Sequence, residues 1–375
     1  MKITSAFDAG NIEVLAADRP DAVRLAIRKD AGDEHMQWFY YRVSGARGLP
    51  LVMRLVNAHQ ASYPDGWTNY QAVASYDRQR WFRVPTRYEG GALVIDHAPE
   101  RDAVYYAYFA PYSLERHADL IARALASPLV AHKNLGSTLD GRDLDLIVVG
   151  EPSAATRACW IIARQHPGET MAEWLVDGLL ARLLDPEDPV ARALLRRAVF
   201  YVVPNMNPDG SFRGHLRCNA AGANLNREWQ EPTLRRPPEV FHVRRAMEAA
   251  GVDLLLDVHG DEALPYNFIA GPDGVPSVTP RVRQLQADYE AALRAASPDF
   301  QSVHGYEPAP LGQATMTMAT NYIADAFGCL AMTLEQPFKD NADLPHPELG
   351  WSPERARLLG RANLDALLAV VDRLR

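Results

Sequence analysis

The feature that most constrains this fold is a series of short, almost wholly apolar runs in the second two thirds of the chain. These runs cover residues 146–149, 159–162, 198–203 and 254–258. Runs of this length without alternating polar residues are typical of strands buried on both faces of a sheet. Stretches with helical spacing follow them, notably residues 171–184, 238–250 and 353–374. We therefore expect an α/β fold with a largely parallel sheet flanked by helices.

The first part of the chain follows a different pattern. Between residues 12 and 109, short runs rich in β-branched and aromatic residues are interrupted by Gly, Pro, Asn and Asp. This pattern is typical of antiparallel strands joined by turns. It ends at residues 110–113, where Ser113 can cap a helix over residues 114–125. We expect an antiparallel β domain over residues 1–112 and the α/β domain over residues 113–375.

Charge and cysteine content exclude several classes of function. The 39 basic and 47 acidic side chains give a net charge of −8, so nucleic acid is not expected as a partner. Cys159, Cys218 and Cys329 are odd in number and lie outside any Cys-x-x-Cys pattern, which predicts neither a disulfide framework nor a cysteine-based zinc site. No apolar run approaches the roughly 20 residues of a membrane helix, and the N-terminus lacks a signal core. We expect a cytoplasmic protein without a membrane partner; the sequence gives no indication of its oligomeric state.

Metal-binding residue types follow two of the predicted buried strands. His166 and Glu169 come directly after the run at 159–162, and His259 comes directly after the run at 254–258. The carboxyl ends of parallel strands meet at one sheet edge, where α/β proteins commonly place their active sites. A His-x-x-Glu pair supplies two of the three protein ligands of a catalytic zinc ion, and the third often comes from far away in sequence. Either Asp257 or Asp261 is placed to orient an imidazole as a hydrogen-bond acceptor.

The remaining histidines lack such a setting. We assign them no ligand role and expect them to lie at the surface or to form structural hydrogen bonds; they include His35, His59, His97, His117 and His242.

Several segments, in order, resemble the cytosolic carboxypeptidase branch of the carboxypeptidase A-type zinc metallocarboxypeptidases. Residues 163–170 (ARQHPGET) resemble the zinc-binding signature of that family. Its consecutive substrate-binding motifs are matched by residues 204–210 (PNMNPDG), 216–218 (LRC), 222–229 (GANLNREW) and 257–262 (DVHGDE), and its interdomain motif by residues 109–113 (FAPYS). The resemblance implies an eight-stranded mixed sheet preceded by a β-sandwich. It also implies one bound Zn²⁺ per chain and hydrolysis of the last peptide bond of a peptide or protein.

The resemblance also implies a role for individual residues. His166, Glu169 and His259 match the zinc ligands, and Glu335 matches the general base that takes a proton from water and later gives one to the leaving amine. Arg217 matches the arginine that polarises the scissile carbonyl and stabilises the oxyanion. Asn226 and Arg227 match the pair that binds the terminal carboxylate of the substrate, which needs a planar donor fork.

Two features depart from the family pattern. Residues 311–315 contain no counterpart of the mobile tyrosine of the digestive enzymes, and Tyr306 and Tyr322 are the nearest candidates. Residues 316–321 offer no basic residue of the kind with which eukaryotic relatives bind an acidic side chain. The net negative charge also disfavours polyglutamate tails. The side-chain preference is therefore left open.

Two other functions compete with a carboxypeptidase. Zinc deacylases of N-acylated amino acids share a His-x-x-Glu pair and a distal histidine, but typically lack the N-terminal sandwich. A silent zinc-bearing protein-binding module would lack the base or the oxyanion arginine, whereas Glu335 and Arg217 are both present. The β domain itself either limits which protein termini enter the site or serves as a folding partner that buries apolar surface.

Overall fold

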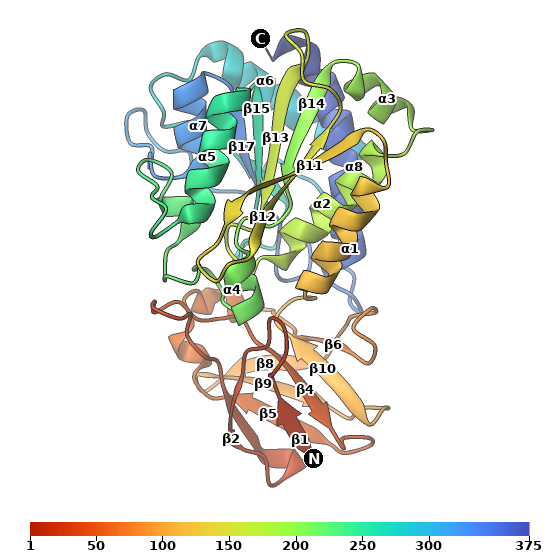
Figure 1. The fold of residues 1–375 in the computed structure, drawn as a ribbon. Helices are drawn as coiled ribbons and strands as arrows, with labels where there is room; N and C mark the ends of the chain where they lie inside the picture. The colour runs from red at the N-terminus through yellow and green to blue at the C-terminus, as the bar shows by residue number, and fades with distance from the viewer. Residues whose placement is uncertain (375) are drawn as a thin grey trace.

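The computed structural model describes residues 1–374 of the chain (Figure 1). The N-terminal strands, drawn in red and orange, lie at one end of the molecule, and a central sheet covered by helices lies at the other. No helix among the described residues combines the length and the apolar character that crossing a bilayer requires.

The N-terminal region, residues 1–112, forms two five-stranded sheets. Their strand orders are β1-β4-β10-β6-β7 and β2-β3-β5-β9-β8. The strands are β1 (Lys2–Thr4), β2 (Glu13–Ala16), β3 (Val23–Ala26), β4 (Tyr40–Ser44), β5 (Leu51–Leu55), β6 (Val73–Ser75), β7 (Phe82–Arg83), β8 (Thr86–Glu89), β9 (Ala92–His97) and β10 (Ala103–Ala107). The predicted antiparallel pairing is confirmed with one exception, β3 and β5, which run parallel. The reason is that β4, which lies between them in the chain, belongs to the other sheet, so the chain returns to its first sheet in the same direction.

The central sheet has seven strands in the order β11-β12-β14-β13-β15-β17-β16. They are β11 (Val130–Ser137), β12 (Asp143–Val149), β13 (Arg157–Ala163), β14 (Ala198–Val203), β15 (Leu254–Val258), β16 (Phe268–Ala270) and β17 (Leu330–Glu335). The four strands β14, β13, β15 and β17 are parallel, and every residue of β14, β15 and β17 is buried. Burial on both faces explains why the corresponding runs contain almost no polar residues.

The expectation of eight strands in this sheet is wrong for the described residues, which contribute seven. Between β16 and β17 the chain forms two helices and a long loop over residues 297–318. That loop contains Gly305, Pro308, Pro310 and Gly312. Proline cannot donate to a strand ladder and glycine weakens it, so this segment does not add a further strand.

Helices cover the sheet on both faces (Figure 1). They are α1 (Leu114–Leu125), α2 (Thr170–Leu183), α3 (Pro189–Leu195), α4 (Pro208–Arg213), α5 (Pro238–Ala250), α6 (Pro280–Ala296), α7 (Ala319–Phe327) and α8 (Pro353–Val370), with short 3₁₀ turns η1 (Pro20–Ala22), η2 (Ala58–Gln60), η3 (Pro64–Trp67), η4 (Leu225–Arg227) and η5 (Val371–Arg373). Helix α1 begins where predicted, because Ser113 Oγ accepts the backbone N–H of Arg116 as an N-cap. The predicted C-terminal helix is also present, although its last residues form η5 rather than α-helix.

The parallel strands decide where chemistry can occur. β13, β15 and β17 are neighbours that run in the same direction, and they end at Ala163, Val258 and Glu335. Their carboxyl ends therefore lie together at one edge of the sheet, so the loops that follow β13 and β15 start beside Glu335.

Candidate active site

Three side chains that are distant in sequence meet at this edge. His166 Nδ1 lies 2.6 Å from Glu169 Oε1, and His259 Nδ1 lies 2.8 Å from Glu169 Oε2. The two Nδ1 atoms are 3.2 Å apart. All three side chains are buried, and their candidate ligand atoms lie within 4.8 Å of one another. Two imidazoles and one carboxylate at this separation are the donor set of a catalytic zinc site.

The outer nitrogen of each imidazole faces a hydrogen-bond acceptor. His166 Nε2 lies 3.0 Å from Asn224 Oδ1, and His259 Nε2 lies 2.9 Å from Asp257 Oδ2. A proton held on Nε2 leaves the Nδ1 lone pair of each ring directed at the centre of the cluster, as metal-ligating histidines require. Of the two aspartates expected to orient an imidazole, Asp257 does so. Asp261 instead accepts a hydrogen bond from the Tyr306 hydroxyl at 2.6 Å.

A series of side-chain hydrogen bonds holds Asp257 in place behind His259. Gln165 Nε2 donates to Asp257 Oδ2 at 2.7 Å, and Trp229 Nε1 donates to Gln165 Oε1 at 2.8 Å. All of these side chains are buried. Trp229 fixes the orientation of the Gln165 amide, and Gln165 in turn holds the Asp257 carboxylate. These hydrogen bonds therefore give the ring of His259 one preferred orientation.

The electrostatic state of the cluster suits a cation. Burial and the nearby Arg217 guanidinium lower the pKa of His166 to about 3, which keeps its lone pair free. Burial alone would raise the pKa of Glu169, but the two histidines outweigh it and hold that pKa well below its usual range. Burial would likewise lower the pKa of His259, but Asp257 and Glu169 raise it well above its usual value. The carboxylates of Asp257 and Glu169 therefore favour a positive charge at this position, and a divalent metal ion would supply that charge in place of the additional proton on His259.

The turn that carries His166 and Glu169 is held by unusual backbone geometry. Arg164 has φ of 60°, in the left-handed region that costs a non-glycine residue about 1 kcal/mol. Its buried guanidinium donates to the carbonyl oxygens of Pro167 at 2.9 Å and Tyr112 at 2.8 Å, and these bonds hold the turn. Gly168 is required by a close approach, since a Cβ there would lie 2.9 Å from the Leu216 carbonyl oxygen.

Glu335 lies at the end of β17 with its side chain buried beside the cluster. Its Oε1 lies 3.2 Å from the Tyr306 hydroxyl oxygen, whereas its Oε2 has no partner among residues 1–374. Burial raises the pKa of Glu335 to about 8. A carboxyl group with one unpaired oxygen and a pKa near neutrality can both accept and release a proton.

Of the two tyrosines considered from the sequence, Tyr306 reaches the site. Its hydroxyl joins Glu335 to Asp261, and its side chain lines the cavity described below. Tyr322 does not line that cavity, and its ring instead packs under the Arg244 guanidinium at 4.9 Å.

Arg217 is placed by contacts from the N-terminal region. The Asp30 carboxylate accepts the backbone N–H groups of Leu216, Arg217 and Cys218 at 2.7, 2.7 and 2.8 Å. The Arg217 guanidinium lies 5.5 Å from the centre of the Tyr63 ring. Its own N–H groups donate to no acceptor among the described residues, so they are available to a bound molecule.

Asn226 and Arg227 lie on η4, and both line the same cavity as the metal-ligating group. Asn226 Oδ1 accepts the backbone N–H of Ala319 at 2.9 Å, which leaves its amide NH₂ free to donate. Arg227 donates one guanidinium N–H to the Asn226 carbonyl oxygen at 2.7 Å, and its other guanidinium N–H groups are available to a bound molecule.

One cavity of about 310 Å³ is lined by all seven residues that the sequence predicted as metal ligands, general base or substrate-binding residues. Its lining includes His166, Glu169, Arg217, Asn226, Arg227, His259 and Glu335. Sequence reasoning missed four residues that line it or orient its members, namely Asp30, Tyr63, Asn224 and Gln165. Gln165 and Asn224 stand inside the motifs and could have been found there. Asp30 and Tyr63 lie in another part of the chain and carry no local signal.

A second cavity, of about 320 Å³, adjoins the first. The two share Ala270, Tyr306, Met318 and Thr333 in their linings. The lining of the second cavity includes the carboxylates of Asp273, Glu290 and Glu307, and it contains no lysine or arginine.

Comparison with known proteins agrees with this geometry. Residues 3–109 match the model of the cytosolic carboxypeptidase N-terminal domain, and residues 118–349 match that of the zinc carboxypeptidases. A metallo-carboxypeptidase from Burkholderia cenocepacia superposes with a TM-score of 0.97 at 52% identity, covering 99% of both chains. One from Pseudomonas aeruginosa, solved in complex with (2-guanidinoethylmercapto)succinic acid, superposes with a TM-score of 0.98 at 47% identity, covering 100% of both.

A more distant relative is cytosolic carboxypeptidase 4 of Mus musculus, which is 28% identical over 71% of this chain. The match covers only 28% of the mouse protein, and the match to cytosolic carboxypeptidase 1 of Homo sapiens covers 26% of that protein, so the chain spans about a quarter of the length of these two relatives.

Proposed function

The chain belongs to the zinc carboxypeptidase family, and from that membership we propose how its own residues hydrolyse the C-terminal peptide bond of peptides or proteins. Zinc is the cofactor of this family. The observation that carries the assignment is the placement of His166, Glu169 and His259 in one cavity with Glu335.

His166, Glu169 and His259 hold the metal, one Zn²⁺ per chain. Bound zinc supplies Lewis acidity, which polarises a carbonyl group and lowers the pKa of water. The family requires this ion, and the donor set described above fits it. The remaining steps depend on side chains of this protein.

Glu335 transfers the proton. Its unpaired Oε2 accepts a proton from the water molecule whose oxygen attacks the carbonyl carbon of the last peptide bond. The same carboxyl group then donates that proton to the amine nitrogen as the C–N bond breaks. Glu335 Oε1 faces the Tyr306 hydroxyl and Oε2 has no partner among the described residues, so we assign the proton exchange to Oε2.

Arg217 stabilises the negative charge that develops on the carbonyl oxygen, and a fixed donor of this kind contributes about 3 kcal/mol. Asn226 and Arg227 bind the free carboxylate of the substrate through their remaining N–H groups. An internal peptide bond offers no carboxylate to this pair, which restricts hydrolysis to the C-terminal residue.

The acidic second cavity favours a substrate with a basic last residue. Thr333 and Met318 line both cavities, Asp273 and Glu290 line the second, and that lining contains no lysine or arginine to pair with them. The compound bound by the Pseudomonas aeruginosa relative carries a guanidino group together with carboxyl groups, as its name states. We therefore propose that the enzyme prefers substrates with a C-terminal lysine or arginine. The sequence alone had left this preference open.

We place the domain boundary between residues 112 and 113. Tyr63 lines the catalytic cavity and Asp30 binds the Arg217 loop, so residues 1–112 contribute to the site itself. This supports a role in substrate access over a role as folding partner alone. A cytoplasmic location remains part of the proposal. It is supported by the names of the relatives and by three cysteines that form no disulfide.

A panel of peptides that differ only in the last residue tests the function. Loss of one residue, seen by mass spectrometry and abolished by a chelator, supports the carboxypeptidase. Release of small acyl groups from N-acylated amino acids would support the deacylase instead. Absence of any turnover with zinc bound would support the silent binding module.

A further inference from the structure

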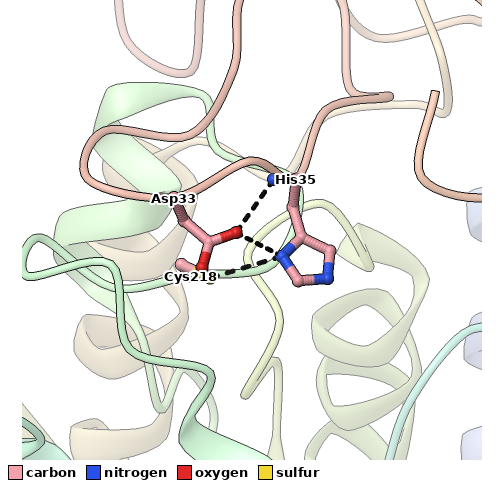
Figure 2. A group of neighbouring side chains, drawn as sticks. All are labelled: Asp33, His35 and Cys218. Carbon is pink, nitrogen blue, oxygen red and sulfur yellow. Dashed lines mark hydrogen bonds and ion pairs between the residues drawn. The ribbon is translucent and has the colours of Figure 1, made fainter. Parts of the chain in front are cut away.

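A second group of metal-ligating side chains lies outside the catalytic cavity, between the N-terminal region and the central sheet. It consists of Asp33 and His35, from the loop between β3 and β4, and of Cys218, which follows Arg217 in the chain. Figure 2 shows the three side chains pointing toward one another from two separate segments. We call them the bridging cluster. Neither the zinc site nor the proton transfer described above uses any of its members.

We propose that the bridging cluster binds a second divalent cation of the zinc class. A thiolate, an imidazole and a carboxylate are the three ligand types that Zn²⁺ combines in proteins. One candidate ligand atom from each residue lies within 4.8 Å of the others. His35 was expected from the sequence to have no ligand role, because Cys218, which completes its setting, lies far along the chain.

The distances allow one ion to contact all three side chains. Cys218 Sγ lies 3.9 Å from His35 Nδ1, and His35 Nδ1 lies 2.5 Å from Asp33 Oδ1. Zinc bonds of about 2.3 Å to sulfur and about 2.0 Å to nitrogen together exceed 3.9 Å, so a single ion can bridge this pair. The ion would replace the proton that His35 and Asp33 share, after a small separation of those two groups.

The cluster is held in place before any ion binds. Asp33 Oδ1 also accepts the backbone N–H of His35 at 2.9 Å, which fixes the two residues as one turn. Cys218 is fixed by its backbone N–H bond to Asp30. The Asp33 and His35 side chains are 27% and 33% exposed, so an ion can enter from solvent.

The local charge also favours a cation. Burial raises the pKa of the Cys218 thiol, and the carboxylates of Asp30 and Asp33 raise it further. The same negative charge attracts a metal ion, and its binding releases the thiol proton.

Cadmium titration of the chelator-treated full chain tests the proposal. Cd²⁺ is the probe because thiolate coordination gives it an ultraviolet charge-transfer band, and His166, Glu169 and His259 contain no sulfur. We expect the band in the wild-type protein, with about two ions bound per chain after dialysis. Cys218→Ser should abolish the band and leave about one ion. Cys329→Ser, at another buried cysteine, is the matched control and should retain both.

Asp33→Asn is a second variant at a partly exposed position, in case Cys218→Ser does not fold. It should lower the Cd²⁺ affinity of the band at least about tenfold. A wild-type protein without the band, a band that persists in Cys218→Ser, or unchanged affinity in Asp33→Asn would overturn the proposal. Hydrolysis of peptides by the wild-type protein is measured without Cd²⁺ and does not depend on the band, so the second site and the proposed function fail separately.

Discussion

Asp30 Oδ2 accepts the backbone N–H of Arg217 at 2.7 Å, across 187 residues of sequence. The same carboxylate accepts the neighbouring backbone N–H groups of Leu216 and Cys218. A residue of the N-terminal region therefore fixes the backbone of the arginine that we assign to the oxyanion. This makes Asp30 a positioning residue, because it acts on the substrate through Arg217.

We predict that Asp30→Asn lowers kcat by about 10-fold to 100-fold and changes KM much less. The amide NH₂ of asparagine cannot accept the N–H groups that the carboxylate accepts, so the Arg217 loop loses its fixed position. Steady-state kinetics on one peptide give the two constants separately. Asp77→Asn is the matched control, since Asp77 accepts the backbone N–H groups of Gln79 and Arg80 in a distant turn.

The double variant with Arg217→Ala isolates this effect. If Asp30 acts through Arg217, Asp30→Asn should have little further effect in the Arg217→Ala background. An undiminished loss of kcat there would show that Asp30 acts by another route.

The second prediction separates metal binding from proton transfer. Glu335→Gln should keep the zinc ion of the catalytic site and lower kcat by about 10² to 10⁴, because the amide cannot accept a proton at the position of Oε2. His259→Ala should lose activity and the zinc ion of the catalytic site, since it removes one of its three ligands. Metal content and kcat are measured on the same samples. Near wild-type turnover in Glu335→Gln would refute the assignment of the base.

The third prediction concerns pH-dependent stability at His117, which was expected to have only a structural role. His117 is buried, with its Nδ1 2.6 Å from Glu173 Oε1 and its Nε2 2.9 Å from Asp145 Oδ2. Burial lowers the pKa of His117, but the two carboxylates raise it more, to about 9. The folded-state pKa lies above the ordinary value of 6.5, so the charged histidine stabilises the fold fully below pH 6.5. This contribution is lost as the pH rises through 9.

The difference between the two pKa values corresponds to about 3 kcal/mol. We expect His117→Gln to remove that much stability at pH 6 and much less at pH 9.5, as measured by urea unfolding. His59→Gln, at an exposed histidine, serves as the control and should show a small effect at both pH values. An equal loss at both pH values for His117→Gln would mean that packing rather than charge stabilises this position.

The fourth prediction concerns substrate preference. Glu290→Gln should lower kcat/KM for a peptide ending in lysine by about tenfold, equivalent to about 1.4 kcal/mol, and leave a peptide ending in phenylalanine unchanged. Asp288→Asn lies on the same helix α6 but outside the cavity lining, so it provides the control. A wild-type enzyme that prefers C-terminal glutamate would contradict the proposed preference directly.

The sequence by itself determined the fold class and the residues at the centre of the site. Buried strands lack polar residues because both of their faces are covered. The strands β13, β14 and β15 could therefore be located from their uninterrupted apolar runs. His166, Glu169 and His259 follow the ends of such strands, and parallel neighbours bring their ends to one edge. Local pattern and strand direction together therefore predicted that these side chains meet.

Only the tertiary structure decided the contacts between segments that no periodicity connects. It selected Asp257 over Asp261 as the partner of His259, and Tyr306 over Tyr322 as the tyrosine at Glu335. It also brought Asp30 to Arg217 and gave the central sheet seven strands. The physical reason is that a helix or strand is encoded by its own spacing of apolar residues, whereas a loop takes its conformation from the surfaces against which it packs.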